Sequence, residues 1–447
     1  MGGIGLRREA PALAAMAALA AMATLAAMAT LAALTALAAM LAVPAGVALA
    51  AAPMAVRLAA GGDHALVLSS TGQMFAFGQN RWGQLASPVN NGTEHPNPTP
   101  TPVTLPGAAG SVAQMAIGFN DSLVLTLSGQ LFSFGGNLWG QLGTTVNVRT
   151  QTPNPTPALV TLPAAQGPVT QIASGANQSL ALTSAGQLYA WGRNRYGELG
   201  QTFDSGTEEP NPTPMLVSLP GATGSISQIA AGGSHSFAVT STGQLFGFGR
   251  DRWGALGIPI GRGAPQENPV PVLLTLPGAT GAVTQIAAGY THTLVLTSTG
   301  QVFAFGRNRF GQLGNSVNIG TERPNPTPTL VTLLGATGAV TQIAAGSGDS
   351  LVLTSAGQLY AFGSNMWGQL GVATNLGTRT PNPTPTLVTL PGATGAVTQI
   401  AAGANNTLAL TSTGQLFTFG RNKWGELGVP INAGTERPTT PTLATLP

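Results

Sequence analysis

Histidines beside aspartate or hydroxyl residues occur at three places in the sequence, and such groups are the ingredients of nucleophilic and acid–base catalysis. In the stretch GYTHTLVLTSTGQVFAFGRNRFGQLG, residues 289–314, His292 lies between two threonines and an Arg-Asn-Arg-Phe cluster follows. His64 and His235 occupy the same place in similar stretches. An active site needs its catalytic residues once, whereas this stretch recurs seven times along the chain. We therefore predict that the protein is not an enzyme, and we assign no catalytic residue.

The composition leaves little material for a metal site, a cofactor or a nucleic-acid site. Cysteine is absent, which excludes disulfides, thiolate nucleophiles and cysteine metal ligands. Only four histidines are present, and no glycine-rich phosphate loop precedes a helical pattern. The formal net charge is +3, and the basic residues are spread thinly, whereas phosphate binding needs a dense basic face. We expect no cofactor, no metal and no nucleic-acid partner.

Residues 1–52 differ in composition from the rest of the chain. An arginine pair near the start is followed by an uncharged run, residues 10–52, that is rich in alanine, leucine and methionine. Ala48 and Ala50 fit the small-residue pattern of a signal-peptide cleavage site. We therefore predict an apolar leader helix that directs export, so that the protein is secreted or extracytoplasmic. The run is also long enough to span a bilayer, and the alternative is a membrane-anchored protein that keeps its leader.

The stretch around His292 is one copy of a long repeat. The glycine of a Gly-Gln pair recurs every 57 residues, at Gly72, Gly129, Gly186, Gly243, Gly300, Gly357 and Gly414. A repeat of this length with several short strand-like runs is typical of a β-propeller, and the absence of an apolar period of 3.6 argues against helical repeats. We predict an all-β fold, a seven-bladed β-propeller of four-stranded antiparallel blades over residues 55–447. The repeats begin near residues 55, 111, 168, 225, 282, 339 and 396.

In the fifth repeat we predict four strands, at residues 282–288, 293–298, 301–306 and 329–334, because these runs are β-branched or aromatic and end at turn residues. A glycine of positive φ closes the tight turn between the second and third strands. Prolines in the long loop before the fourth strand are expected to prevent ladder pairing there. We further expect each fourth strand to pair with the next unit, so that the C-terminal strand joins the blade begun near Ala55 and closes the ring.

The segments IAAGYTHTLVL and GQVFAFGRNRFGQLG recur together, and LAAGGDHALVL and IAAGGSHSFAV match the first of them. This pattern resembles the regulator of chromosome condensation repeat family over residues 55–447, and the leader makes the chain closest in type to the secreted bacterial members. The resemblance implies a seven-bladed propeller. It leaves the function open, because members include an exchange factor for a nuclear small GTPase, interaction modules of large ligases and a secreted inhibitor of β-lactamase.

One aromatic residue per repeat could be imagined as a platform for sugars or bases. A residue type that every unit repeats serves what every unit must do, so we predict a structural role, packing between blades. These residues are Trp82, Trp139, Tyr196, Trp253, Phe310, Trp367 and Trp424. The basic residue that precedes the aromatic one in five repeats is expected to pack its stem on the ring or to form an ion pair at the rim.

The turn between the first and second strands varies at its two central positions, and we expect all seven turns on one face of the ring. Phe119 and Tyr290 place aromatic side chains at two turn tips with polar neighbours, as protein interfaces prefer. We predict that a protein partner binds through Asp63, His64, Phe119, Asn120, Asp121, Asn177, His235, Tyr290, His292 and Asp349. The proline-rich loop between the third and fourth strands provides a second variable face.

Taken together, the sequence predicts a monomeric, exported scaffold without catalytic activity that binds a protein partner by surface complementarity, as an interaction or inhibitor-like module. No pattern in the sequence identifies the partner. Two alternatives stay open. The first is an intracellular guanine-nucleotide-exchange or other regulatory module of the same repeat family, in which the leader has no export function. The second is a carbohydrate-binding lectin.

Overall fold

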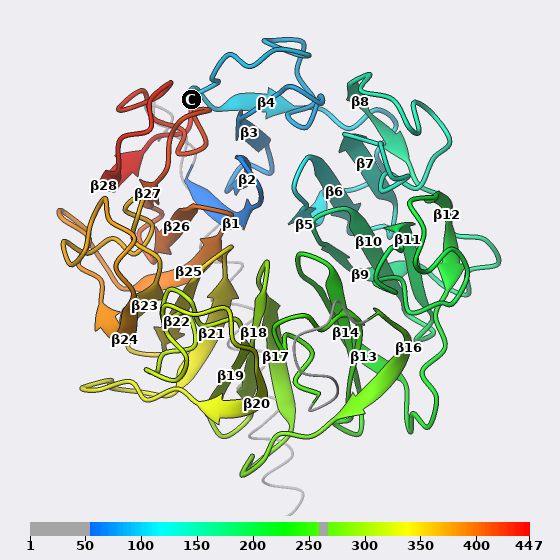
Figure 1. Cartoon of the computed structure of the whole chain (residues 1–447). Helices are drawn as coiled ribbons and strands as arrows, with labels where there is room; N and C mark the ends of the chain where they lie inside the picture. Colours follow the sequence, from blue (N-terminus) through cyan, green and yellow to red (C-terminus); the bar gives the residue numbers. More distant parts are fainter. Residues whose placement is uncertain (1–53, 259–266) are drawn as a thin grey trace, which may run out of the picture. The chain divides into compact units, whose positions relative to one another are not determined.

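The computed structural model describes residues 54–258 and 267–447, which consist of β-strands, turns and irregular segments. The strands form seven four-stranded antiparallel sheets, and the first strand of each sheet lies innermost in a ring (Figure 1). The predicted all-β, seven-bladed propeller is therefore confirmed. The leader predicted for residues 1–52 lies outside the described residues. No helix long and apolar enough to cross a membrane occurs in the described ranges.

Each blade consists of four strands that are consecutive in the chain. The innermost strands are β1 (Ala55–Ala60), β5 (Val112–Ile117), β9 (Val169–Ser174), β13 (Ile226–Ala231), β17 (Val283–Ala288), β21 (Val340–Ala345) and β25 (Val397–Ala402). The second strands are β2 (His64–Ser69), β6 (Asp121–Thr126), β10 (Gln178–Thr183), β14 (His235–Thr240), β18 (His292–Thr297), β22 (Asp349–Thr354) and β26 (Asn406–Thr411). The third strands are β3 (Met74–Gly78), β7 (Leu131–Gly135), β11 (Leu188–Arg193), β15 (Leu245–Arg250), β19 (Val302–Gly306), β23 (Leu359–Gly363) and β27 (Leu416–Gly420). The outermost strands are β4 (Thr101–Val103), β8 (Asn154–Leu159), β12 (Pro210–Leu216), β16 (Glu267–Leu274), β20 (Asn325–Leu330), β24 (Asn382–Leu387) and β28 (Thr439–Ala444).

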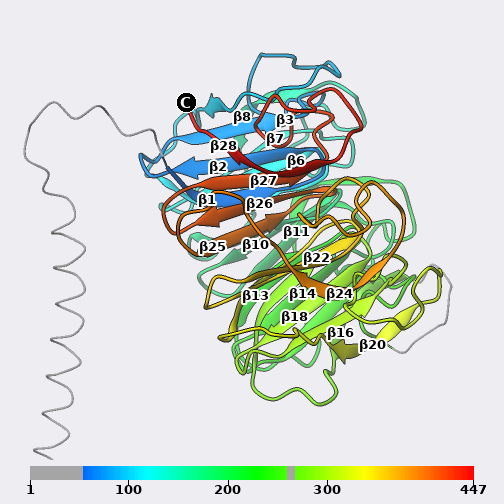
Figure 2. The ribbon, with the colours of Figure 1, turned by 90° about the vertical axis from the view of Figure 1, so that its left-hand side faces the viewer.

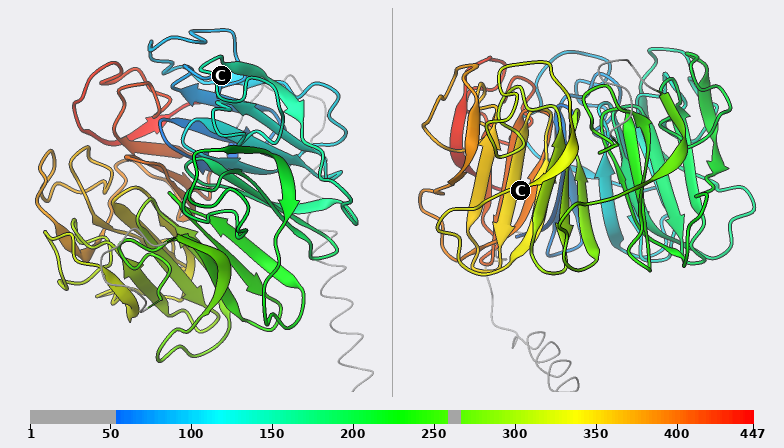
Figure 3. Two further views of the ribbon diagram at one scale, coloured as in Figure 1. Left: turned by 45° about the vertical axis from the view of Figure 1, so that its right-hand side comes forward. Right: turned by 60° about the horizontal axis from the view of Figure 1, so that its bottom comes forward.

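The burial of the strands follows from the packing of each blade between two neighbours, which the side views show (Figure 2 and Figure 3). In blade 5, every residue of β18 and β19 is buried. Successive side chains of β18 point to opposite blades, because Leu294 lies in the apolar cluster shared with blade 6 and Val295 in the cluster shared with blade 4. Strands covered on both faces need apolar residues at consecutive positions, which explains the continuous apolar runs of the repeat.

Three of the four strands predicted for the fifth repeat are confirmed to within one residue. The fourth was predicted too late in the chain, because β20 begins at Asn325 and includes two prolines that the sequence argument excluded from pairing. Its ladder to β19 joins Phe303 to Leu330 and Gly306 to Asn325, with an irregularity between them. β20 is an edge strand, and an edge strand tolerates proline where the nitrogen faces away from the ladder.

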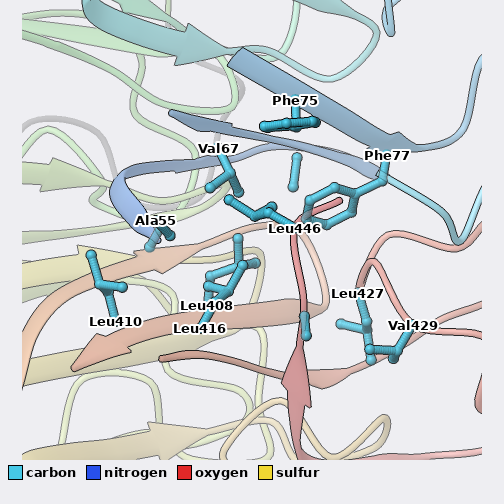
Figure 4. Packing of buried hydrophobic residues seen from close by; sticks show 13 residues of the cluster. Ala55, Val67, Phe75, Phe77, Leu408, Leu410, Leu416, Leu427, Val429 and Leu446 are labelled. Atoms are coloured by element: carbon cyan, nitrogen blue, oxygen red, sulfur yellow. The ribbon is translucent and has the colours of Figure 1, made fainter. Parts of the chain in front are cut away.

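The prediction that the C-terminal strand joins the first blade is wrong. β28 pairs with β27 of its own blade, where Ala444 lies opposite Leu416, and every other sheet also contains four consecutive strands. The ring closes by packing instead. Leu446, which follows β28, shares one apolar cluster with Phe77 of blade 1 and Leu427 of blade 7 (Figure 4). The apolar faces of the first and last blades thus meet without exchange of a strand.

Glutamines of the innermost strands add hydrogen bonds between neighbouring blades. Across the junction of the last and first blades, Gln399 accepts a hydrogen bond from the Leu58 amide at 2.9 Å and donates one to the Val56 carbonyl at 3.3 Å. Gln114 of β5 bridges in the same manner to the amide and carbonyl of Ile172 in β9, at 2.9 and 3.0 Å. The closing junction therefore uses the same kind of contact as a junction inside the ring.

The variable turns and the proline-rich loops lie at the same edge of the ring, so the prediction of a second variable face is wrong. Adjacent strands are antiparallel, and a turn that precedes the second strand therefore emerges beside a loop that follows the third. The ladder places His292, at the start of β18, opposite Gly306, at the end of β19. We call this edge the turn face. It contains the turns between first and second strands and the loops between third and fourth strands.

The closing contact predicts unequal effects of truncating two C-terminal leucines. Leu446 is 7% exposed and Leu443 is 45% exposed. We expect Leu446→Ala to lower the free energy of unfolding by about 2 kcal/mol or more, because it leaves a cavity between the first and last blades. Leu443→Ala should change it by no more than about 0.5 kcal/mol. Urea unfolding followed by tryptophan fluorescence measures both, and equal midpoints for the two variants would contradict closure by packing.

Candidate protein-binding face

A ring of close backbone contacts surrounds the centre of the turn face. The first strand of each blade is followed by a glycine: Gly61, Gly118, Gly175, Gly232, Gly289, Gly346 or Gly403. A Cβ atom on Gly232 would lie 2.5 Å from the Gly289 carbonyl oxygen of the next blade. The equivalent distances at the other six glycines are between 2.3 and 2.7 Å. The amide of Gly233 donates to the Gly289 carbonyl oxygen at 3.0 Å. Glycine is required here because a side chain would force the blades apart.

A hollow of about 200 Å³ opens at the centre of this ring. Backbone and small side chains from all seven blades line it, and Phe119 of blade 2 and Tyr290 of blade 5 are the large side chains at its turn tips. The other five tips carry Gly62, Ala176, Gly233, Ser347 and Ala404. Phe119 is 40% exposed and Tyr290 is 51% exposed. The two aromatic residues singled out in the sequence therefore lie, accessible, at the rim of one hollow.

Five of the predicted partner-binding residues are buried. They are His64, Asp121, His235, His292 and Asp349. Each is the first residue of a second strand, and the side chains of Asp121, His235, His292 and Asp349 lie directly beneath the glycine that follows the first strand of their own blade. The His64 Nε2 atom lies 2.9 Å from the Ser122 hydroxyl, and the Ser174 hydroxyl donates to the Asp121 carboxyl at 2.8 Å. Four of these side chains, those of His64, Asp121, His235 and His292, thus lie within hydrogen-bond distance of a hydroxyl of the next blade, and none of the five is accessible to a partner on the turn face.

Burial keeps this inner ring of side chains uncharged. It lowers the pKa of His64 and His292 to about 3 and that of His235 to about 4. It raises the pKa of Asp121 to about 8 and that of Asp349 well above its usual value. The histidines are therefore neutral and Asp121 is largely protonated near pH 7, because a charge at these positions would lose its hydration. In the described ranges, no group of three or more histidine, cysteine, aspartate or glutamate residues is arranged to hold a metal ion.

The remaining predicted residues, Asp63, Asn120 and Asn177, are partly exposed on the turn face. Asp63 forms an ion pair with Arg421 of blade 7 at 3.1 Å, across the closing junction. Burial raises the pKa of Asp63, and the neighbouring Arg421 opposes this effect. The accessible part of the predicted site thus consists of the two aromatic tips and the two asparagines, while Asp63 is engaged within the ring.

The repeated aromatic residue lies half-buried between blades in every repeat. The seven positions are Trp82, Trp139, Tyr196, Trp253, Phe310, Trp367 and Trp424. Its carbonyl oxygen accepts a hydrogen bond from a backbone amide at or just before the outermost strand of the next blade, as from Asn154 of β8 to Trp82 at 3.0 Å. The same bond crosses the closing junction, from Asn97 to Trp424, at 2.8 Å. This residue therefore joins blades through its backbone as well as its ring.

Two sets of basic side chains lie over these aromatic rings. The residue that precedes the aromatic one lies over its ring, as in blade 4, where the guanidinium carbon of Arg252 is 4.8 Å from the centre of the Trp253 ring. The predicted contact with the ring is thus present, through the guanidinium. A second set, at or directly after the end of the third strand, reaches the ring of the preceding blade: Arg250 lies 4.3 Å from Tyr196 and Arg307 lies 5.1 Å from Trp253. Sequence reasoning missed this second set, because only the packing of blades shows that it crosses to a neighbour.

Glutamates of the long loops bind these basic residues, so the expected rim ion pairs are also confirmed. In three blades one glutamate binds both sets: Glu208 binds Arg193 and Arg195, Glu322 binds Arg307 and Arg309, and Glu436 binds Arg421 and Lys423. The Arg193–Glu208 distance is 3.0 Å and the Lys423–Glu436 distance is 2.7 Å. Both partners of each pair reach the surface, so these pairs order the rim more than they stabilise the fold.

A buried amide or carboxyl accepts a hydrogen bond from the backbone of the aromatic residue. Glutamine does so in four blades, at Gln84, Gln141, Gln312 and Gln369. Glu198 accepts from the Tyr196 amide and Glu426 from the Trp424 amide, both at 2.6 Å. Burial raises the pKa of Glu198 to about 7 and that of Glu426 to about 8. Near pH 7, Glu426 is therefore mostly protonated and Glu198 about half protonated, at a position where four blades have a neutral amide.

Comparison with known proteins identifies the family. A profile described as the RCC1-like domain matches residues 168–447, and profiles of the regulator of chromosome condensation (RCC1) repeat match residues 55–84, 71–125 and 128–182. The chain belongs to the RCC1 repeat family. It is 30% identical over 374 residues to the ultraviolet-B receptor UVR8 of Arabidopsis thaliana, covering 83% of this chain and 78% of the relative. A human E3 ubiquitin-protein ligase, HERC2, is 31% identical over 70% of this RCC1-repeat chain, which spans only 6% of the ligase.

Solved structures share the fold of this RCC1-repeat chain. Human WBSCR16 superposes with a TM-score of 0.70 at 24% identity, covering 84% of this chain and 94% of that one. Prp20p of Saccharomyces cerevisiae superposes with a TM-score of 0.69 at 23% identity, covering 88% and 87% of the two chains. At this level of identity the likeness establishes the propeller and leaves the binding partner open.

The buried glutamates predict a loss of stability at alkaline pH. The pKa of Glu426 is raised in the folded state, so the folded chain keeps a proton that the unfolded chain releases above about pH 4.5. Its contribution to stability is therefore present below that pH and is lost as the pH rises through about 8. Glu426→Gln, which restores the common amide, should raise the melting temperature near pH 9 and change it little near pH 5.

Glu198→Gln is the matched variant for this measurement. Its pKa is raised less, so its gain near alkaline pH should be smaller than that of Glu426→Gln. Thermal unfolding by circular dichroism across the pH range measures both. A gain that is the same at acid and alkaline pH would contradict a role for the buried proton.

Proposed function

We propose that this RCC1-repeat protein is a non-catalytic scaffold that holds a protein partner on its turn face by surface complementarity. The observation that carries the proposal is the placement of Phe119 and Tyr290, which are the large exposed side chains among seven otherwise small turn tips around one hollow. Exposed aromatic side chains at the centre of a face, bordered by polar groups, are typical of binding hot spots. The hollow gives such a partner a concave surface.

Known relatives support a protein partner as the class of ligand. The solved structure of Prp20p is described together with its binding to Gsp1p and histones, and a second yeast RCC1 structure contains bound Kap60. These partners belong to those proteins. They favour the use of RCC1-repeat propellers as binding modules, and they also keep an intracellular regulatory role, such as nucleotide exchange, as the second candidate.

The lectin alternative is less well supported, because the aromatic rings that would bind a sugar are covered by basic side chains. Its sugar platforms would be the repeated aromatic residues, and basic side chains lie over these rings, as Arg250 does over Tyr196 and Arg252 over Trp253. A sugar would have to displace a cation from the face on which it stacks. A protein partner needs no such displacement at the two turn-tip aromatics.

Truncation of the turn-tip aromatics tests the proposed face. Phe119→Ala combined with Tyr290→Ala should abolish capture of a bound protein from the native extracytoplasmic fraction, because both anchors of the interface are removed. Both side chains are exposed at turn tips, so the melting temperature should stay close to that of the unchanged protein.

Leu127→Ala is the control for this capture experiment. Leu127 is 72% exposed and directly follows β6, at the edge opposite the turn face. Its truncation removes an exposed apolar side chain at that opposite edge and should leave capture intact. Undiminished capture by the double variant, measured by mass spectrometry of the eluted proteins, would overturn the proposed face.

We further propose that the scaffold is exported, which rests on the composition of residues 1–52 and the Ala48 and Ala50 pattern. The mature protein should begin at Ala51 and be recovered outside the cytoplasm as a monomer. Mass spectrometry of the intact purified protein measures its N-terminus. A cytoplasmic protein that retains Met1 would contradict export and favour the regulatory role, while a full-length membrane-bound form would indicate an uncleaved anchor.

A further inference from the structure

The basic cluster of blade 4 lacks the carboxylate that its counterparts have. In blade 5, both basic residues bind Glu322, which lies 15 residues after the first of them. In blade 4, the residue 15 positions after Arg250 is Pro265 in the sequence. Within residues 54–258 and 267–447, neither Arg250 nor Arg252 forms an ion pair.

The turn residue that pairs with the basic cluster of blade 7 is also replaced by an uncharged residue next to Arg250. Arg421 of blade 7 binds Asp63, which belongs to the turn of the next blade around the ring. The equivalent turn residue next to Arg250 is Thr291 of blade 5. Thr291 is 3% exposed, and its buried hydroxyl has no hydrogen-bond partner among the described residues. An unpaired buried hydroxyl is costly, so this position favours a ligand that accepts its hydrogen.

These groups meet in one small pocket between blades 4 and 5. Its volume is about 20 Å³, room for a small polar group, and its wall includes Arg250, Trp253, Tyr290 and Thr291. Arg250 lies between two aromatic rings, 4.3 Å from that of Tyr196 and 5.4 Å from that of Trp253. The guanidinium thus lies against two aromatic rings while its charge has no counterion among residues 54–258 and 267–447. Tyr290 also borders the central hollow, so the pocket and the hollow share one lining residue on the turn face.

We propose that Arg250, with Arg252 beside it, binds the carboxylate of an aspartate or glutamate side chain from the protein partner, and that Tyr290 packs on an apolar residue next to it. This inference rests on the proposed function and specifies the chemistry of the partner: an acidic segment with an adjacent apolar side chain. The chain itself favours carboxylate over phosphate, because the equivalent basic pairs of three blades each hold one glutamate. The planar fork of arginine matches the two oxygens of a carboxylate.

A charge substitution at Thr291 tests the proposal with a matched control. Thr291→Asp introduces a carboxylate at the position that Asp63 has relative to Arg421. The new aspartate should form an ion pair with Arg250 and so block the binding of a carboxylate from a partner. Thr291→Asn is the control, because asparagine has nearly the same shape as aspartate but carries no charge. Asparagine also occupies this turn position in three other repeats, as Asn120, Asn177 and Asn405. The probe is a fluorescein-labelled peptide in which glutamate alternates with glycine around a central phenylalanine, and the same peptide with glutamine for glutamate is its uncharged control.

Fluorescence anisotropy with the full protein measures the outcome. We expect the glutamate peptide to bind the unchanged protein and Thr291→Asn with similar affinity, and to bind Thr291→Asp and Arg250→Gln about tenfold or more weakly. Equal binding of the glutamine peptide, unchanged binding to Thr291→Asp, or no binding to the unchanged protein would overturn the carboxylate site. Competition by inorganic phosphate or duplex DNA that exceeds competition by glutarate would overturn it in favour of a phosphate ligand.

The outcome is separable from that of the proposed function. Phe119 lies in blade 2, away from this pocket, and Phe119→Ala tests the turn face alone. If protein capture depends on Phe119 while the two Thr291 variants bind the peptide equally, the proposed face is supported and the carboxylate site is wrong. If the peptide discriminates the Thr291 variants while capture ignores Phe119 and Tyr290, the pocket binds acids but the proposed face is wrong.

Discussion

The close approach of neighbouring blades around the centre of the ring is the constraint on which the rest of the structure depends. A Cβ on the glycine after any first strand would lie within 2.3 to 2.7 Å of a carbonyl oxygen of the next blade. Backbones this close leave no room for water, so the side chains directly beneath must be uncharged or paired. The depressed pKa of His64 and the raised pKa of Asp121 are consequences of this packing. In four of the seven blades the polar residue that begins the second strand lies beside a hydroxyl of the next blade, whether it is a histidine or an aspartate.

This constraint also separates binding residues from joining residues. A side chain inside the second or third strand faces a neighbouring blade and is not available to a partner, whereas a residue at the end of the third strand, such as Arg250, reaches the turn face. Variation at a buried position, as between His64 and Asp121, is variation inside a joint. On the turn face, the turn tips and the rim are both variable and exposed. There the aromatic tips Phe119 and Tyr290, and Arg250, which forms no ion pair among the described residues, distinguish single blades in a way that a partner can detect.

The sequence predicted the repeat, the number of blades and the inner three strands of the fifth repeat, because each depends on local patterns that recur at a fixed interval. It placed the outer strand too late, since proline is excluded from a ladder only where its nitrogen must donate, and an edge strand has a free side. It also proposed a strand exchange at the C-terminus that Leu446 makes unnecessary by packing on Phe77. Among the proposed site residues, it identified the exposed Phe119 and Tyr290 but included His292, which is buried.

The sequence by itself determined the architecture of this protein, its lack of cysteine chemistry and the residues that every blade repeats, because these are properties of one unit multiplied along the chain. Only the tertiary structure decided which residues of neighbouring units meet. Arg250 and Tyr196 belong to different repeats, yet their side chains stack because one blade lies against the next. Likewise, Arg421 has the carboxylate of Asp63 beside it, whereas Arg250 has Thr291 at the equivalent place. In both cases the two residues belong to different blades, so the difference becomes visible only when the blades are packed together. Contacts across an interface between repeats depend on relative placement in space, which no pattern within a single repeat contains.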